Sequence, residues 1–348
     1  MKLNFEQLTS ITSGAVRTWE DDRGFHVCRF TEKQTEAYAC RRENMHRNTR
    51  SSSGIVLGFR TDSPSLSISV NVRSCSGRAY FSLDVLADRR YVGSLKNYTL
   101  PTPGANYHAM AAPLGVFSGM FPLGQGEKTV EIYLPWSVEC IITALELADG
   151  ASLLPVKRGK KLLAFGDSIT QGYDALEPRN KYITRLADRL GMEEINKAVG
   201  GEVFWPELAA MRDDLQPDLI TVAYGTNDWT NRTCEDLQKA SRKFFENLRE
   251  TYPDAPILAL TPLWRKDHAQ DRKSYKSFHH VEKLIRRAVE DLPGVTVIRG
   301  WELIPQQENL YGDHTVHPND EGFQCCFENL LKTAEPMIYE GECNEAKL

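Results

Sequence analysis

Short alternating runs of apolar and polar side chains predict β-strands in the N-terminal part of the chain. Two such runs flank a Thr-Asp-Ser-Pro turn, and in the second of them every other residue from Leu66 to Val72 is apolar. A period of two is typical of a strand with one buried face. Similar runs, separated by glycine and proline, occur at residues 80–86, 128–134 and 139–147. No long amphipathic helix interrupts them, so we predict an all-β sandwich over residues 1–157.

The pattern changes after Gly150, where short apolar runs alternate with longer amphipathic segments. The apolar runs have the length of buried strands and lie at residues 162–165, 194–199, 219–224, 257–261 and 295–298. The segments between them are long enough for helices, as in the charged stretch 235–251. Such alternation implies a parallel sheet covered on both faces. We therefore predict an α/β domain with a parallel five-stranded sheet over residues 158–348.

Composition and charge indicate a folded, soluble protein. Of the 348 residues 41% are hydrophobic, and 42 basic against 47 acidic side chains give a net charge of -5. This balance provides no basic surface for a polyphosphate, so we predict no nucleic-acid partner. The longest stretch without charged side chains, residues 97–126, is interrupted by several prolines and glycines. We predict loops and short strands there rather than a membrane span, and no membrane partner.

The N-terminus and the cysteines indicate a reducing compartment. No continuous apolar run follows Lys2, so the start of the chain does not resemble a secretory signal, and we expect a cytoplasmic protein. The eight cysteines are scattered and form no Cys-x-x-Cys pair. We therefore expect all eight to be reduced thiols rather than disulfides or metal ligands.

Candidate reactive side chains follow the predicted strands of the second domain, where ligands bind in α/β sheets. The first strand leads into Gly-Asp-Ser, which ends at Ser168, the second into Gly200-Gly201, and the third to Asn227. Far downstream lies His317, which could deprotonate a serine alcohol, a poor nucleophile at its own pKa. Taken singly, each of these residues also has an ordinary structural role as a helix cap, turn former or loop residue.

The ordered set Gly-Asp-Ser, Asn-x-x-x-Gly-Gly, Gly-x-Asn-Asp and His-Pro-Asn-Asp resembles the SGNH, or GDSL-type, hydrolase family over about residues 158–335. The resemblance implies a flavodoxin-like fold and a serine esterase that needs no cofactor. By matching position, it implies Ser168 as the nucleophile and His317 as the general base. The N–H groups of Ser168 and Gly201 and the side chain of Asn227 would form the oxyanion hole.

The last block departs from the family pattern at one position. The family places an aspartate three residues before the histidine, but here that position is His314, and Asp313 lies one residue further away. Either Asp313 orients the imidazole of His317 through a shifted loop, or a backbone carbonyl does so. We predict Asp313, because no other acid precedes His317 in this loop. A metal site at His314-x-x-His317 is the alternative; the other blocks already assign His317 to the esterase, so we predict no metal.

Aromatic and basic residues near the same loops are candidates for substrate binding. Trp205, Trp229 and Trp264 could stack on sugar rings, and Arg265 could bind hydroxyls or a carboxylate. The alternative for each of them is packing within the loops.

A β-sandwich followed by an SGNH domain is similar to the two-domain carbohydrate acetylesterases, whose accessory domain is a jelly roll. This similarity predicts removal of acetyl groups from oligosaccharides such as xylan or mannan fragments through an acetyl-enzyme. The partner would be a small-molecule or oligosaccharide ester, and the sequence specifies no oligomeric state. The alternatives are a GDSL-type lipase, lysophospholipase or thioesterase, which needs an apolar acyl trench, and a non-catalytic carbohydrate-binding protein.

Overall fold

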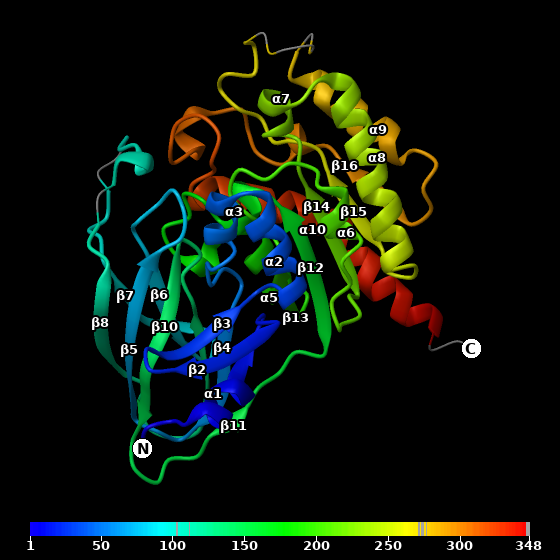
Figure 1. Ribbon diagram of the computed structural model, residues 1–348. Helices are drawn as coiled ribbons and strands as arrows, with labels where there is room; N and C mark the ends of the chain where they lie inside the picture. Colours follow the sequence, from blue (N-terminus) through cyan, green and yellow to red (C-terminus); the bar gives the residue numbers. More distant parts are fainter. Residues whose placement is uncertain (102–103, 111, 271, 273–274, 276, 346–348) are drawn as a thin grey trace. The chain divides into compact units, whose positions relative to one another are not determined.

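The computed structural model (Figure 1) describes residues 1–101, 104–110, 112–270, 272, 275 and 277–345, with side chains up to residue 339. The chain divides into two compact units. The first unit comprises Met1–Gly159 and two later segments, Leu176–Asn180 and Glu193–Asn196. The second comprises Lys160–Ala175, Lys181–Met192 and Lys197–Leu348. The chain therefore returns to the first unit twice after residue 159.

The first unit contains two antiparallel sheets. One has the strand order β1-β4-β9-β6-β7, with β11 paired to β4, and the other has the order β2-β3-β10-β5-β8. The strand bounds are β1 Thr12–Ser13, β2 Arg17–Asp21, β3 Gly24–Cys28, β4 Val56–Thr61, β5 Ser65–Ser74, β6 Ser82–Ala87, β7 Arg90–Lys96, β8 Gly115–Pro122, β9 Lys128–Tyr133, β10 Val138–Leu147 and β11 Leu154–Pro155. The alternating residues of β5 from Leu66 to Val72 lie in a continuous buried core, as their period of two predicted.

Short helices accompany the sandwich, and the hydrophobic period did not predict them. They are α1 Phe5–Ile11, α2 Glu32–Arg41, α3 Glu43–Asn48 and the 3-10 turn η1 Tyr107–Ala109. Both α1 and α2 begin with a capping box, formed by Asn4 with Gln7 and by Thr31 with Gln34. Such reciprocal caps satisfy free backbone groups and allow helices too short to show a clear period. The predicted loop-and-strand segment 97–126 contains η1 and β8, with residues 102, 103 and 111 outside the described part.

A parallel sheet of five strands has the order β13-β12-β14-β15-β16; four of its strands lie in the second unit, whereas residues 193–196 of β13 are grouped with the first. Its strands are β12 Lys160–Gly166, β13 Met192–Asn196, β14 Leu219–Ala223, β15 Ile257–Leu260 and β16 Val295–Ile298. The pairs β12–β14, β14–β15 and β15–β16 are parallel. The prediction of an α/β domain with a parallel five-stranded sheet, preceded by an all-β sandwich, is confirmed.

Helices and turns connect these strands. They are α4 Ser168–Gln171, η2 Pro178–Asn180, α5 Tyr182–Arg189, α6 Pro206–Ala209, α7 Asp228–Asn231, α8 Cys234–Thr251, α9 His279–Val289, η3 Gly300–Glu302, η4 Glu308–Leu310 and α10 Asp320–Glu345. In the part of the chain that the structure describes, no helix is both long and apolar enough to cross a bilayer. Seven cysteines carry free thiols: Cys28, Cys40, Cys75, Cys140, Cys234, Cys325 and Cys326. The side chain of Cys343 lies outside the described residues.

Candidate active site

Ser168 is placed at the start of α4, directly beyond the carboxyl end of β12. Asp167 caps this helix, its Oδ1 accepting the Ile169 N–H at 3.0 Å. Ser168 is the first helical residue, so its N–H has no acceptor within the helix. A β-carbon at Gly166 would lie 2.3 Å from the Thr170 hydroxyl, so glycine there allows the tight turn from strand to helix. Local sequence therefore holds the Ser168 hydroxyl and N–H at a strand end.

Ser168, His317 and Asp313 form a continuous chain of hydrogen bonds. Ser168 Oγ lies 2.8 Å from His317 Nε2, and His317 Nδ1 lies 2.6 Å from Asp313 Oδ2. This is the arrangement of a nucleophile, a general base and the acid that orients the base. The distance between Asp313 and His317 is within hydrogen-bonding range despite the additional residue between them.

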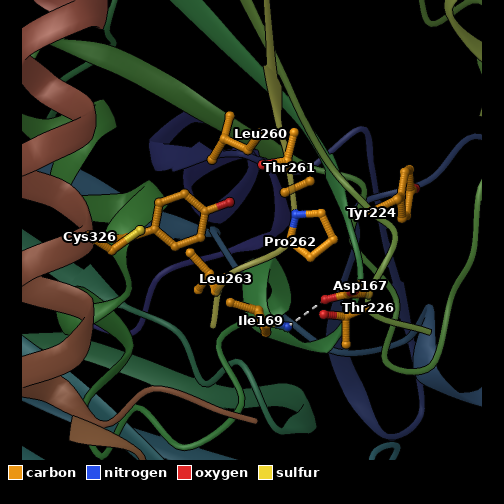
Figure 2. Close-up of a pocket in the computed structure, with 11 residues that line it drawn as sticks. Asp167, Ile169, Tyr224, Thr226, Leu260, Thr261, Pro262, Leu263 and Cys326 are labelled. Carbon is orange, nitrogen blue, oxygen red and sulfur yellow. Dashed lines mark hydrogen bonds between the residues drawn. The ribbon is translucent and has the colours of Figure 1, made fainter. Parts of the chain in front are cut away.

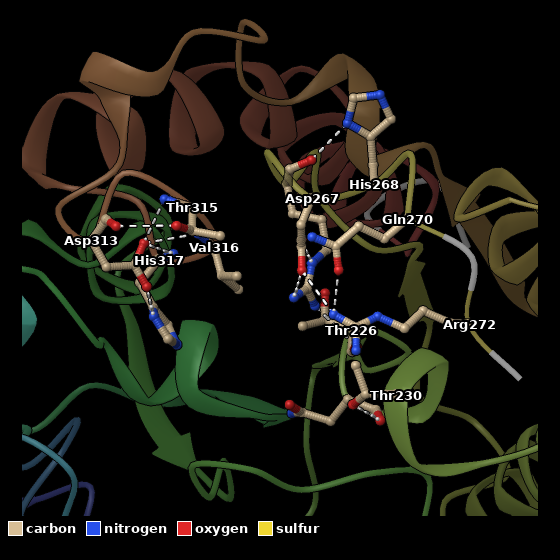
Figure 3. A network of polar contacts seen from close by, with 12 residues as sticks. Thr226, Thr230, Asp267, His268, Gln270, Arg272, Asp313, Thr315, Val316 and His317 are labelled. Carbon is tan, nitrogen blue, oxygen red and sulfur yellow. Dashed lines mark hydrogen bonds and ion pairs between the residues drawn. The ribbon is translucent and has the colours of Figure 1, made fainter.

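The loop from Asp313 to His317 explains how the additional residue is accommodated (Figure 3). Asp313 Oδ1 accepts the N–H groups of Thr315, Val316 and His317 at 2.9, 2.8 and 3.1 Å. His314 adopts a left-handed backbone conformation with φ 58°, which tightens the loop around the carboxylate. The second oxygen of Asp313 thus remains directed at the His317 ring.

The electrostatic environment keeps Asp313 ionised. Burial opposes the charged form, but the hydrogen bond from His317, the charge of that ring and the backbone amides outweigh it. Together they hold the pKa of Asp313 well below its ordinary value. A permanently charged carboxylate is suited to stabilising an imidazolium at His317.

The glycine loop after β13 is fixed against α4. The Gly200 N–H donates to Gln171 Oε1 at 2.8 Å, and a β-carbon at Gly200 would lie 2.6 Å from the Tyr173 hydroxyl oxygen. Gly201 has φ 83°, a left-handed conformation that favours glycine. Its N–H makes no hydrogen bond within the described part of the chain. Gly201 therefore offers a free backbone donor.

Asn227 ties the loop after β14 to this glycine loop. Its Nδ2 donates to the backbone carbonyl of Glu202, the residue after Gly201, at 2.9 Å. The carboxylate of Asp228 adds a second link, because its Oδ1 accepts the Phe204 N–H at 3.3 Å. An amide nitrogen has two hydrogens, so one remains for a ligand. The strand-end loops of Ser168, Gly201 and Asn227 thus supply the donors that an oxyanion needs.

Comparison with known proteins identifies this domain. Residues 164–325 match the model of the GDSL-like Lipase/Acylhydrolase family. The matched residues, which include Ser168, Asn227 and His317, are similar to that family, in agreement with the four sequence blocks. No curated protein sequence matches it significantly.

Solved structures share the fold of this chain at low sequence identity. A salicylyl-acyltransferase from a tetracycline biosynthetic pathway is 20% identical, with a TM-score of 0.79 and 94% of each chain covered. A putative GDSL-like lipase from Bacteroides ovatus is 19% identical, with a TM-score of 0.76 and coverage of 97% of this chain and 98% of that one. An acetyl xylan esterase from Butyrivibrio proteoclasticus is 15% identical, with a TM-score of 0.61 and coverage of 97% and 99%.

Of the aromatic residues in the loops of the α/β domain, Trp229 and Trp264 are buried and Trp205 is half-buried. Arg265 is also buried; its Nε and Nη2 bond both carboxylate oxygens of Asp267 at 2.5 and 2.9 Å, and its guanidinium lies 4.9 Å from the Trp229 ring centroid. Internal packing therefore accounts for Trp229 and Arg265 in this conformation. Trp205 retains exposed surface for a ligand.

Two buried carboxyl groups, those of Asp167 and Asp228, belong to the loops after β12 and β14. Burial raises the pKa of Asp167 to about 6 and that of Asp228 to about 7. Asp228 remains close to a cation, with Arg232 Nε 3.5 Å from its Oδ1. Both residues belong to the sequence blocks. Their carboxyl groups accept backbone N–H groups: Asp167 caps α4, and Asp228 binds Phe204 after the glycine loop.

One group of potential metal ligands occurs among the described residues, and it does not include His314. Asp174, Asp313 and His317 each offer an atom, and these atoms lie within 4.8 Å of one another. His317 Nδ1 and Asp313 Oδ2 are already hydrogen-bonded at 2.6 Å, so we assign the group to the acid–base chain and not to a metal. The group does contain Asp174, which sequence reasoning missed although it stands six residues after Ser168.

A small cavity lies next to Asp167 and Ile169 (Figure 2). Its volume is about 20 Å³, room for roughly one water molecule. Most of its lining is apolar, contributed by residues such as Ile169, Leu260 and Leu263, with Asp167 at one side. The residues that line it include neither Ser168 nor His317.

Proposed function

We propose that this protein is a serine esterase that removes O-acetyl groups from carbohydrates. The observation that carries the proposal is the hydrogen-bonded chain from Ser168 through His317 to Asp313, with 2.8 Å and 2.6 Å between its members. In this proposal Ser168 is the nucleophile, His317 the general acid and base, and Asp313 the group that orients and stabilises the imidazolium.

The first half of the proposed reaction transfers the acyl group to the enzyme. Ser168 Oγ attacks the ester carbonyl while its proton moves to His317 Nε2, and the carbonyl oxygen becomes an oxyanion. The N–H groups of Ser168 and Gly201 and the remaining Asn227 Nδ2 hydrogen would stabilise that charge. Collapse of the tetrahedral intermediate breaks the C–O bond to the sugar. The departing oxygen takes the proton from His317, which leaves an acyl-enzyme.

The second half of the proposed reaction returns the enzyme to its starting state. Water attacks the acyl carbonyl and gives its proton to His317 Nε2. The second tetrahedral intermediate collapses with return of that proton to Ser168 Oγ, which releases the carboxylic acid. Asp313 remains ionised throughout, consistent with the lowered pKa of its carboxyl group.

Comparison of folds supports a short acyl group on a carbohydrate. Proteins with the same fold include the acetyl xylan esterase and a family two carbohydrate esterase from Clostridium thermocellum in complex with cellohexaose. The latter is 16% identical, with a TM-score of 0.62 over 83% of this chain and 93% of that one.

Acid release from a matched panel of esters tests this proposal. We expect acetate release from acetylated xylan and mannan oligosaccharides, and faster turnover of an aryl acetate than of the aryl octanoate. The product should be measured both as free acid and as the ester of an added alcohol, because one protein with the same fold is an acyltransferase. Preference for octanoate would favour the lipase alternative, and no activity on any ester would contradict the enzyme assignment.

A chelator provides the control for metal dependence. Because Ser168 and His317 supply the nucleophile and the base in the proposed mechanism, we expect activity to persist after dialysis against EDTA. Loss of activity that a divalent ion restores would contradict the serine mechanism.

A further inference from the structure

The segment after α4 folds back onto the proposed general base. The helix ends at Gly172, which has φ 116°, and the N–H groups of Gly172 and Tyr173 both donate to the Ser168 carbonyl, at 3.0 and 2.9 Å. The Tyr173 ring packs against the His317 imidazole with 5.2 Å between centroids and 31° between planes. This turn therefore holds the residues after Ser168 beside the base.

Asp174, the next residue, is buried in the same turn. Its side chain is fully inaccessible and its φ is 71°, a left-handed conformation uncommon for a residue with a β-carbon. A carboxylate oxygen of Asp174, one of Asp313 and a ring nitrogen of His317 lie within 4.8 Å of one another. Two carboxyl groups thus lie close to a single imidazole.

We propose that Asp174 is a positioning residue whose carboxylate stabilises the protonated imidazole of His317 that forms in each acyl-transfer step. The proposal rests on the function proposed above. It differs from the role of Asp313, because Asp313 bonds the ring directly at 2.6 Å, whereas Asp174 would act through its charge.

The charges around His317 give the physical reason. A carboxylate oxygen within 4.8 Å of a ring nitrogen attracts the positive charge of a protonated imidazole, and burial weakens the screening by water. The other groups near His317 are Ser168 and Asp167 at the start of α4 and Tyr173 in the turn. Arg265, which lowers the pKa of Asp167, is paired with Asp267.

NMR titration of His317 tests the proposal without any substrate. In the full chain carrying Ser168→Ala, we expect Asp174→Asn to lower the pKa of His317 by about one unit or more, as loss of a charge at this distance does elsewhere. The His317 signal is assigned by its loss in His317→Gln. Asparagine suits Asp174 because it tolerates the left-handed conformation. Asp174→Gly, which also adopts it, serves as a second variant should the first misfold.

A matched control separates local charge from the effect of changing any aspartate in a left-handed turn. Asp88, with φ 49°, lies in the first unit and bonds the Thr129 N–H. Asp88→Asn should leave the pKa of His317 unchanged. An unchanged pKa in folded Asp174→Asn or Asp174→Gly would overturn the proposal.

Kinetic measurements on the chain that retains Ser168 then link the charge of Asp174 to turnover. In Asp174→Asn, the acid limb of the kcat/KM profile should move to lower pH by the same amount, with a lower plateau because the base is weaker. A purely structural role would lower the plateau and leave the limb in place. If the wild-type chain hydrolyses no ester, the proposed function fails, whereas the NMR result still decides whether Asp174 stabilises the imidazolium.

Discussion

The proposed chemistry depends on a few donors and acceptors that come from distant parts of the sequence. Ser168 and His317 are 149 residues apart, yet their reactive atoms are 2.8 Å apart. Asp313 lies one residue outside the position that the family pattern predicts, but its Oδ2 reaches His317 Nδ1 because three backbone amides hold its other oxygen. This contact supports the proposal that Asp313 orients the imidazole.

Substitution of the nucleophile should separate chemistry from folding. We expect Ser168→Ala to abolish ester hydrolysis with an unchanged circular dichroism spectrum, because no other hydroxyl bonds His317 Nε2 among the described residues. Asn227→Ala should lower kcat by ~10²-fold or more through the loss of an oxyanion donor. Near-wild-type kcat in folded Ser168→Ala would refute the nucleophile assignment, and an effect of Asn227→Ala on KM alone would make Asn227 a substrate contact.

Removal of the Asp313 charge should impair turnover strongly. Asp313→Asn would present an amide donor to His317 Nδ1 and favour the wrong tautomer, so we expect kcat to fall by ~10³-fold or more. A loss of only a few-fold would favour a serine–histidine dyad.

The lowered pKa of Asp313 also fixes the sign of its pH dependence. Its contribution to stability is present above the unfolded pKa of about 3.9 and is lost as pH falls through the lower folded pKa. Melting temperatures measured from pH 7 down to pH 3 should therefore drop more steeply for the wild type than for Asp313→Asn. Parallel curves would contradict this linkage.

At the scale of the elements, the contact between the glycine loop and α4 fixes the position of Gly201, one of the proposed oxyanion donors. Gln171 fixes the Gly200 N–H at 2.8 Å, and Tyr173 occupies the space where a Gly200 side chain would project. Tyr173 in turn packs against His317. A change in this loop is thus transmitted to the base as well as to the oxyanion site.

Gly200→Ala tests this coupling. The added carbon would displace the Tyr173 ring and shift His317, so we expect kcat to fall by ~10-fold or more, since small misplacements of reacting groups are costly. Gly159→Ala is the matched control, because nothing lies within 4 Å of its β-carbon position. Equal kcat for the two variants in an aryl acetate assay would show that the loop tolerates the change.

On the scale of the whole molecule, the two units are not separated by a single cut in the sequence. The segments Leu176–Asn180 and Glu193–Asn196 follow the start of the α/β domain but belong to the first unit. There, Tyr98 donates to the Leu176 carbonyl at 2.9 Å, and Arg29, fully buried, donates to the Asn196 carbonyl at 2.7 Å. A boundary near residue 158 therefore separates segments that fold together.

A fragment of residues 160–348 should consequently be unstable. The fragment would lack residues 1–159, with which the segments Leu176–Asn180 and Glu193–Asn196 are grouped. We therefore expect a lower melting temperature than that of the full chain, or no cooperative transition, by circular dichroism. The same fragment should lose activity on the aryl acetate. A fragment that melts like the full chain and retains kcat would show that the α/β domain folds independently.

The sequence by itself determined the class of each half and the order of the chemical blocks. Period-two alternation identified the sandwich strands, and apolar runs separated by helical segments identified the parallel sheet, because both patterns record which side chains face a core. The Gly-Asp-Ser, Gly-Gly, Asn-Asp and His-Pro motifs identified the family. These signals are local or ordered along the chain, so they needed no coordinates.

Only the tertiary structure decided which side chains meet. It placed Asp313 at the imidazole, buried Trp229 and Trp264, and brought Asp174 beside His317, none of which follows from spacing alone. It also showed that short capped helices accompany the sandwich and that two later segments are grouped with the first unit. The physical reason is that loop direction and burial depend on packing between residues far apart in the chain, which a one-dimensional pattern does not encode.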